Sequence, residues 1–72
     1  MNQGTAMQIT LNGKSRSLDP IPTVAALLDS LNLDASRVAV EHNRVVLLMG
    51  DFAATPLRDG DVLEIVQFVG GG

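Results

Sequence analysis

The chain has 72 residues, of which 46% are hydrophobic, with two Phe and no Trp, Tyr or Cys. This length suits one small domain with an aliphatic core, and the lack of cysteine excludes disulfides, thiolate metal sites and a thiol nucleophile. The net charge of −3, with five Lys plus Arg, argues against nucleic acid or an anionic membrane as partner. No apolar run approaches the ~20 residues of a membrane span and no signal peptide is visible, so a cytoplasmic protein is expected.

The first patterned segment is a predicted β-hairpin. Residues 1–6 carry no pattern. They are expected to be a disordered leader, a remnant of protein expression, or the stretch before an alternative start at Met7. Residues 7–11 alternate apolar and polar, which indicates a half-buried strand. Asn12-Gly13 is the strongest short hairpin signal, because both positions of a type I′ turn need positive φ. Residues 14–18 then return as a strand whose polar content predicts a sheet edge.

A short amphipathic helix is predicted next. Pro20 and Pro22 end the second strand, since proline cannot donate to a ladder. Thr23 is placed to cap the helix through its hydroxyl, and Asn32 is a plausible stop signal. Four apolar residues fall at i, i+3, i+4 and i+7, on one helix face: Val24, Leu27, Leu28 and Leu31. Their burial would contribute roughly 6–10 kcal/mol gross.

Short segments separated by turn-forming residues follow the helix. In chain order we predict a strand over 37–41, a turn over 42–44, a strand over 45–48, a loop over 49–56 that holds a single helical turn, a turn over 59–61 and a strand over 62–69. Leu57 is expected to contact the core. No repeat or linker interrupts this pattern, so residues 7–69 are predicted to be one domain.

This order of elements predicts an α+β protein of the β-grasp (ubiquitin-like) class, with a mixed sheet packed on one main helix. The last strand is apolar at nearly every position, so we expect it inside the sheet and parallel to the first strand. Alternation would turn Leu63 and Ile65 toward the helix, and Val66 and Phe68 toward the opposite, open face. There Val66 and Phe68 either form a docking patch, or Phe68 merely fills a gap in a small sheet.

The sequence ends in three glycines, Gly70, Gly71 and Gly72, directly after the last strand. At an average glycine usage of about 7%, three in a row at a chosen place have a chance probability of about one in several thousand. Three interpretations compete: the remnant of a linker, an inert frayed end, and a flexible tail that is threaded into the active site of another protein. In the third, the Gly72 carboxylate is the reacting group.

Glycine suits that third role chemically. A carboxylate is a poor electrophile and must first be activated, most simply by transfer to AMP. A terminal glycine has no Cβ, so its activated carbonyl is open on both faces, and the glycines before it fit a narrow channel. Ordering three backbone units costs on the order of 3–6 kcal/mol, so a folded body is expected to dock alongside the tail.

Several stretches resemble the ThiS family, the ubiquitin-like sulfur carriers of thiamine biosynthesis. The resemblance rests on the hairpin 7–14, the helix opening 23–28, the Asn43 turn, the segment 59–65 and the ending 68–72. It covers residues 7–72, and its most specific part is the last strand with the terminal glycines. The short chain and this ending favour the thiamine carriers over MoaD, the similar small subunit of molybdopterin synthase. Gly70 and residues 1–6 depart from the shortest family pattern.

The resemblance implies a mechanism. A ThiF-like adenylating enzyme would use ATP and Mg²⁺, which this chain does not itself bind, to adenylate Gly72. A persulfide from a cysteine desulfurase or another sulfur source would then give a thiocarboxylate, which thiazole synthase would consume. Gly70 and Gly71 would thread the partner's channel, and Val66, Phe68 and Glu64 would dock. For three acids we keep two roles open, pairing with basic partner residues or plain solvated positions: Asp59, Asp61 and Glu64.

No other constellation in the sequence points to catalysis or to a metal. His42 is the only histidine and is predicted to be a surface turn residue, not a metal ligand. The acids suggest no paired carboxylates, so a carrier and cosubstrate is expected, not an enzyme. The alternatives are sulfur carriage for molybdopterin synthesis or tRNA thiolation, and a non-covalent ubiquitin-like interaction module with a passive tail.

Overall fold

The structure is a computed structural model that describes residues 6–69. The predicted tail 70–72 and, apart from Ala6, the predicted leader 1–6 therefore lie outside the described residues. The elements in chain order are β1 (Met7–Leu11), β2 (Lys14–Leu18), α1 (Val24–Ser30), the 3₁₀ helix η1 (Ala35–Arg37), β3 (Val38–His42), β4 (Val45–Leu47), the 3₁₀ helix η2 (Met49–Ala54) and β5 (Val62–Gln67).

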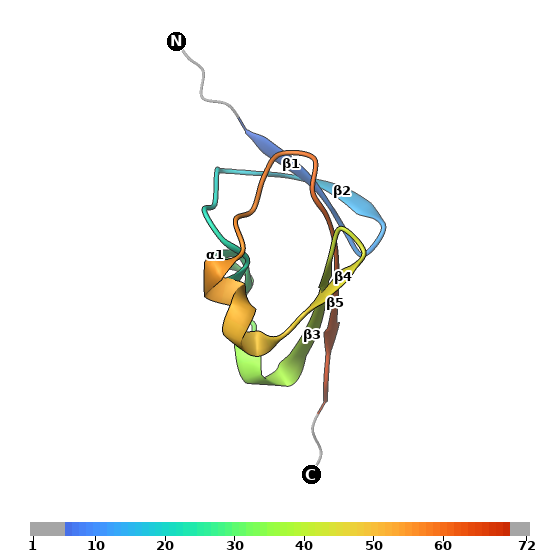
Figure 1. Cartoon of the computed structure of the whole chain (residues 1–72). Helices are drawn as coiled ribbons and strands as arrows, with labels where there is room; N and C mark the ends of the chain where they lie inside the picture. The colour runs from blue at the N-terminus through green and yellow to red at the C-terminus, as the bar shows by residue number, and fades with distance from the viewer. Residues whose placement is uncertain (1–5, 70–72) are drawn as a thin grey trace.

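The strands form one mixed five-stranded sheet in the order β2-β1-β5-β3-β4. β5 lies in the centre, parallel to β1 and antiparallel to β3, as its apolar sequence predicts. Both α1 and η2 lie on one side of the sheet, and the described residues leave the other side uncovered (Figure 1). The predicted β-grasp architecture is thus confirmed, and β2 lies at an edge as expected.

The hairpin and its turn agree with prediction. Asn12 and Gly13 have φ values of 51° and 81°, the positive values that a type I′ turn requires. The Asn12 side chain also extends the contact between β1 and β5. Its Oδ1 accepts from the Ile65 N–H at 2.8 Å and its Nδ2 donates to the Ile65 carbonyl at 3.1 Å. This amide takes the place of a further residue of the ladder.

α1 begins where the sequence indicates and ends one residue before Leu31, the last residue of the predicted helix face. The Thr23 hydroxyl accepts from the Ala26 N–H at 3.1 Å, which satisfies one of the free donors of the first turn. The helix ends at Ser30, and Asn32 has a φ of 58°. The Leu33 N–H then donates to the Leu28 carbonyl at 2.9 Å, which is typical of a helix closed by a left-handed residue.

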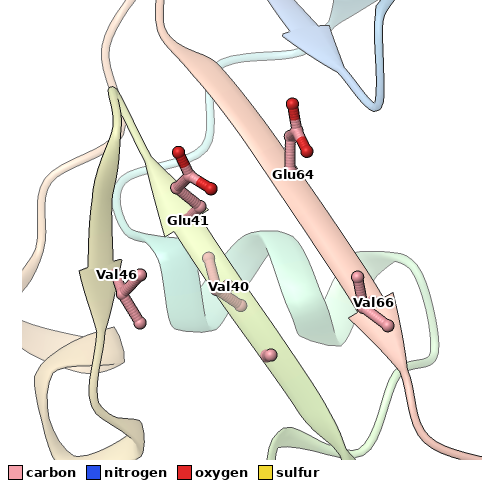
Figure 2. A pocket seen from close by; sticks show the side chains of 6 residues that line it. Val40, Glu41, Val46, Glu64 and Val66 are labelled. Atoms are coloured by element: carbon pink, nitrogen blue, oxygen red, sulfur yellow. The ribbon is translucent and has the colours of Figure 1, made fainter.

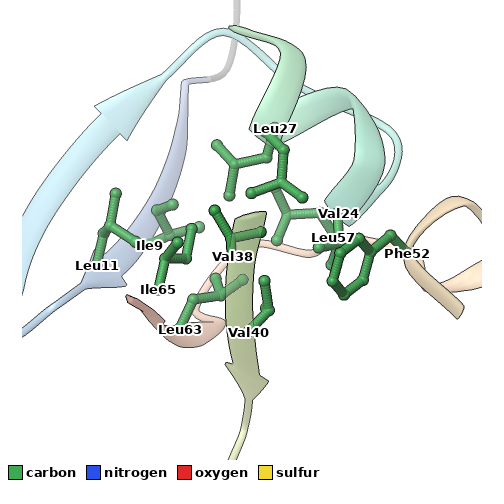
Figure 3. Packing of buried hydrophobic residues seen from close by; sticks show 11 residues of the cluster. Ile9, Leu11, Val24, Leu27, Val38, Val40, Phe52, Leu57, Leu63 and Ile65 are labelled. Carbon is green, nitrogen blue, oxygen red and sulfur yellow. The ribbon is translucent and has the colours of Figure 1, made fainter. Parts of the chain in front are cut away.

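The core lies between the sheet and α1 with η2 (Figure 3). Leu63 and Ile65 face this core, and Leu57 belongs to it, as predicted. Phe52, on η2, fills space beside α1 and was not singled out by the sequence pattern, whereas Leu31 is only partly buried. The buried apolar residues are Ile9, Leu11, Val24, Leu27, Leu28, Val38, Val40, Phe52, Leu57, Leu63 and Ile65.

Besides the end of β3, which lies at His42 and not at Glu41, three predicted strand limits are wrong by one or two residues. β3 begins at Val38, because Arg37 completes η1, a turn that Asp34 caps by accepting from the Ser36 N–H at 2.9 Å. β4 ends at Leu47, because Leu48 leads into η2. β5 ends at Gln67 and not at Val69. At the ends of β4 and β5, apolar residues continue past the last residue of the strand. At the start of β3, a capped turn takes the place of the first predicted strand residue.

A polar cluster holds the start of β5 against the turn between β3 and β4. His42 ends β3 and its side chain is 17% exposed, so the prediction of a surface turn residue is wrong. Its Nε2 lies 2.8 Å from Oδ2 of Asp61, which is itself 8% exposed. Asp61 also accepts from the Asn43 side chain at 3.1 Å and from the Arg58 N–H at 2.9 Å. One carboxylate therefore ties three segments together.

Burial raises the pKa of the Asp61 carboxyl, but hydrogen bonds from His42, Asn43 and the Arg58 N–H lower it by more, so the net pKa is below its ordinary value. A carboxyl whose pKa is lower in the folded state stabilises the fold at pH values above its unfolded pKa. That stabilisation is lost as the pH falls through the folded pKa.

We therefore expect Asp61→Asn to lower the free energy of unfolding by about 1–3 kcal/mol at pH 7, because an amide cannot accept from every donor that now meets Asp61. The deficit should shrink as the pH is lowered below the unfolded Asp value of about 3.9, where the wild type loses its charge. Urea unfolding between pH 7 and pH 3 measures this, with exposed Asp29→Asn as control. A deficit that is constant with pH would contradict the assignment.

Candidate tail and docking site

The chain leaves the sheet at Phe68. The Phe68 N–H donates to the Arg37 carbonyl at 2.8 Å, and within the described residues no later backbone hydrogen bond holds the chain. Val69 is 95% exposed. The predicted threading residues Gly70 and Gly71 and the predicted attachment residue Gly72 lie outside the described residues. The structure thus places the root of the predicted tail at the end of the central strand.

The exposed large apolar side chains of the described residues gather in two segments, 45–49 and 62–69. Val66 and Phe68 are 57% and 56% exposed, so Phe68 does not merely fill a gap in the sheet. Val66 projects from the open face (Figure 2), as alternation along β5 predicts. The complete set is Val45, Val46, Leu48, Met49, Val62, Val66, Phe68 and Val69. Such a concentration is typical of an interaction surface.

Glu64 lies on the same open face, two residues before Val66 on β5, and is exposed. Around it the surface forms a shallow hollow of about 120 Å³. Figure 2 looks onto this hollow with a helix behind the strands. Its lining comes from β3, β4 and β5: Ala39, Val40, Glu41, Val46, Glu64 and Val66.

Glu41 and Val46 are members of this surface that sequence reasoning missed. Alternation along β3 already places the Glu41 side chain on the face of the sheet opposite to that of the buried Val38 and Val40. Its position beside Glu64, however, depends on the register between β3 and β5, which no local pattern contains. Val46 follows in the same way from the pairing of β4 with β3.

The other two acids considered for docking serve the fold. Asp61 is buried and hydrogen-bonded within the cluster described above, so neither of its two predicted roles is right. Asp59 is exposed, but its Oδ1 accepts from the Gln8 N–H at 2.7 Å and thereby joins the turn before β5 to the start of β1. Of the three acids, Glu64 alone presents its carboxylate on the open face.

The remaining chemistry of the described residues is sparse. They contain no group of three or more His, Cys, Asp or Glu residues able to hold a metal ion. None of their helices is both long and apolar enough to span a membrane.

Comparisons with known proteins agree on one family. The ThiS family model matches residues 9–72. The chain is 38% identical to the sulfur carrier protein ThiS of Bacillus subtilis over 65 residues, which cover 89% of this chain and 98% of that protein. The crystal structure of the thiamine biosynthesis protein ThiS from Geobacter metallireducens superposes with a TM-score of 0.76 at 40% identity, covering 92% of this chain and all of that one.

A longer protein also contains a similar segment. The chain is 42% identical over 66 residues to a thiazole synthase of Paramagnetospirillum magneticum. These residues are 92% of this chain but 20% of that protein. The chain thus spans about a fifth of the length of this relative.

The two sides of β5 predict opposite responses to substitution. Val66→Thr and Phe68→Ser change exposed side chains, so the free energy of unfolding should change by no more than about 0.5 kcal/mol. Leu63→Ala, on the core side of the same strand, should cost about 2–5 kcal/mol, since it opens a cavity. Urea unfolding of the three variants tests this. A large loss in Val66→Thr would show that the open face is covered in the free protein.

Proposed function

This chain belongs to the ThiS family, and we infer that it is a sulfur carrier of thiamine biosynthesis in which Gly72 carries the sulfur. The resemblance stated from the sequence is confirmed by the family match and by the named carriers. These relatives belong to thiamine biosynthesis, so we set aside the molybdopterin and tRNA-thiolation alternatives.

One observation carries the assignment of Gly72. The family match continues without interruption through the exposed root of the tail to residue 72. The fold brings this root out of the sheet at Phe68, beside an open face with no covering element among the described residues. A reactive group a few residues beyond Phe68 can enter a partner's active site while the sheet remains intact outside it.

The proposed chemistry begins with activation of the Gly72 carboxylate. A carboxylate oxygen attacks the α-phosphorus of ATP, and pyrophosphate leaves, which gives an acyl-adenylate. The terminal sulfur of a persulfide then attacks the acyl carbon, and AMP leaves. Finally a thiol cleaves the resulting acyl disulfide, so that the thiol is oxidised to a disulfide and the tail keeps a thiocarboxylate. Mg²⁺ and ATP are held by the adenylating partner and not by this chain.

This scheme implies three kinds of partner. A ThiF-like enzyme would adenylate the tail, and a thiazole synthase would take the sulfur, with a cysteine desulfurase or another persulfide donor between them. The similar segment within a protein named thiazole synthase supports the second partner. Gly70 and Gly71 would lie in each partner's channel, while Val66, Phe68 and Glu64 would contact its surface. The cytoplasmic location expected from the sequence belongs to this proposal.

The chain acts in this scheme as a carrier and cosubstrate. The adenylating and thiazole-forming enzymes would supply the catalytic groups. A passive interaction module remains the competing function, since it too would use an exposed sheet face. The two differ in whether the end of the tail is modified.

We expect protein isolated from its native host to react with a thiol-specific alkylating agent on the peptide that ends in Gly72. The chain has no cysteine, so a thiocarboxylate is the group on this peptide that such a reagent would label. Mass spectrometry of the C-terminal peptide measures the label and also establishes whether the native polypeptide ends at Gly72. Intact mass alone would be ambiguous, because replacing oxygen by sulfur adds nearly the mass of one methionine oxidation.

Two variants serve as controls: one that lacks Gly72 and one with a single alanine added after it. Both should keep the thermal unfolding transition of the wild type and lose the label, because the reacting carboxylate has moved. Wild-type chain that stays unlabelled after incubation with ATP, a persulfide donor and the adenylating enzyme would overturn the proposal in favour of a passive module.

A further inference from the structure

The open face carries two carboxylates in direct opposition. The antiparallel register of β3 and β5 pairs Glu41 with Glu64, and both side chains project from the same face (Figure 2). Like charges that face each other across two strands destabilise a sheet. A single neutral residue at either position would remove this repulsion, so the pair is a cost that the fold itself does not require.

Nothing in the described residues compensates these two charges. The ion pairs of residues 6–69 are those of Arg37 with Asp34 and of His42 with Asp61. Neither the Glu41 nor the Glu64 side chain forms a hydrogen bond or an ion pair with another described residue. Asp61 makes a useful contrast, because three donors surround its carboxylate. The two carboxylates on the open face can thus accept hydrogen bonds for which the described residues supply no donor.

Apolar walls flank the two carboxylates. Val46 lies opposite Glu41 on the β4 side, and Val66 lies on β5, where it pairs with Ala39. The small Ala39 side chain leaves room between the valines, which is the hollow of about 120 Å³. A side chain that fits such a surface has an aliphatic stem and a cationic head. Arginine matches best, because its planar fork of donors can meet two carboxylates at once.

We propose that the hollow between Val46 and Val66 receives an arginine or lysine side chain of the adenylating enzyme, whose charge is neutralised by Glu41 and Glu64 together. This inference rests on the proposed function and adds to it a partner contact and two residues, Glu41 and Val46. Each enzyme that handles the tail must approach the end of β5, the adenylating enzyme first, and Val66 connects the hollow with that end. The hollow and the tail would thus be engaged by one partner surface.

The test compares stability with binding in one set of variants. Glu41→Gln/Glu64→Gln removes both charges, and Asp19→Asn/Asp29→Asn removes two exposed charges elsewhere as a matched control. We expect the first double variant to unfold at the same temperature as the wild type or higher, because the repulsion is gone. Its affinity for the adenylating enzyme in calorimetric titration should fall at least tenfold, and should depend less on salt than that of the wild type. The control should bind within twofold.

A variant that reverses the charge at Glu64 gives an independent test of the same contact. Glu64→Lys would face Glu41 with an opposite charge, so the free protein should become more stable while binding is lost. Binding of both variants within twofold of the wild type would overturn the contact even where the wild type forms the thiocarboxylate. A wild type that forms no thiocarboxylate would instead overturn the proposed function, so the two failures are distinguishable.

Discussion

The fold depends on the position of β5 between β1 and β3. This strand is paired on both sides, and it has a different environment on each face: Leu63 and Ile65 are buried under α1, whereas Glu64 and Val66 are exposed. Alternation with period two makes these environments inseparable. The same six residues therefore hold the core, present the open face of the sheet and lead toward Phe68 and Val69.

Polar side chains fix the register of β5 at two points, Val62 and Ile65. Asn12 bonds the Ile65 backbone from the β1 hairpin, and the Asn43 Oδ1 accepts from the Val62 N–H at 2.9 Å from the β3–β4 turn. A slip of one residue would bury Glu64 and expose Leu63. The hydrophobic pattern already opposes that slip, and the two asparagines restrict it further, because each can meet its backbone partners in one register alone. Both turns thus help to position the open face of β5, although neither lies on that face.

Much of this arrangement was predictable, and the exceptions have a common physical cause. The hairpin, the cap of α1 and the two faces of β5 follow from local periodicity and turn chemistry, which act over a few residues. The burial of His42 and Asp61 and the pairing of Glu41 with Glu64 were not predictable. They join positions 19 to 23 residues apart, and only the sheet register decides which distant residues meet. The ends of β4 and β5 were mispredicted because Leu48, Phe68 and Val69 are apolar but lie exposed beyond the strands.

The exposed face and the tail make one energetic unit in the proposed carrier. Three glycines lose on the order of 3–6 kcal/mol of conformational entropy when a channel orders them, and they have no side chains with which to offset that loss. Contacts of the folded body must supply the difference, so apolar residues such as Val66 and Phe68 belong near the root of the tail. The same residues would favour association between copies of the chain. Glu41 and Glu64 oppose this, since two such faces would bring four carboxylates together, whereas a face that bears a cation would be attracted. The carboxylates thus favour a basic partner over a second copy at a cost in stability.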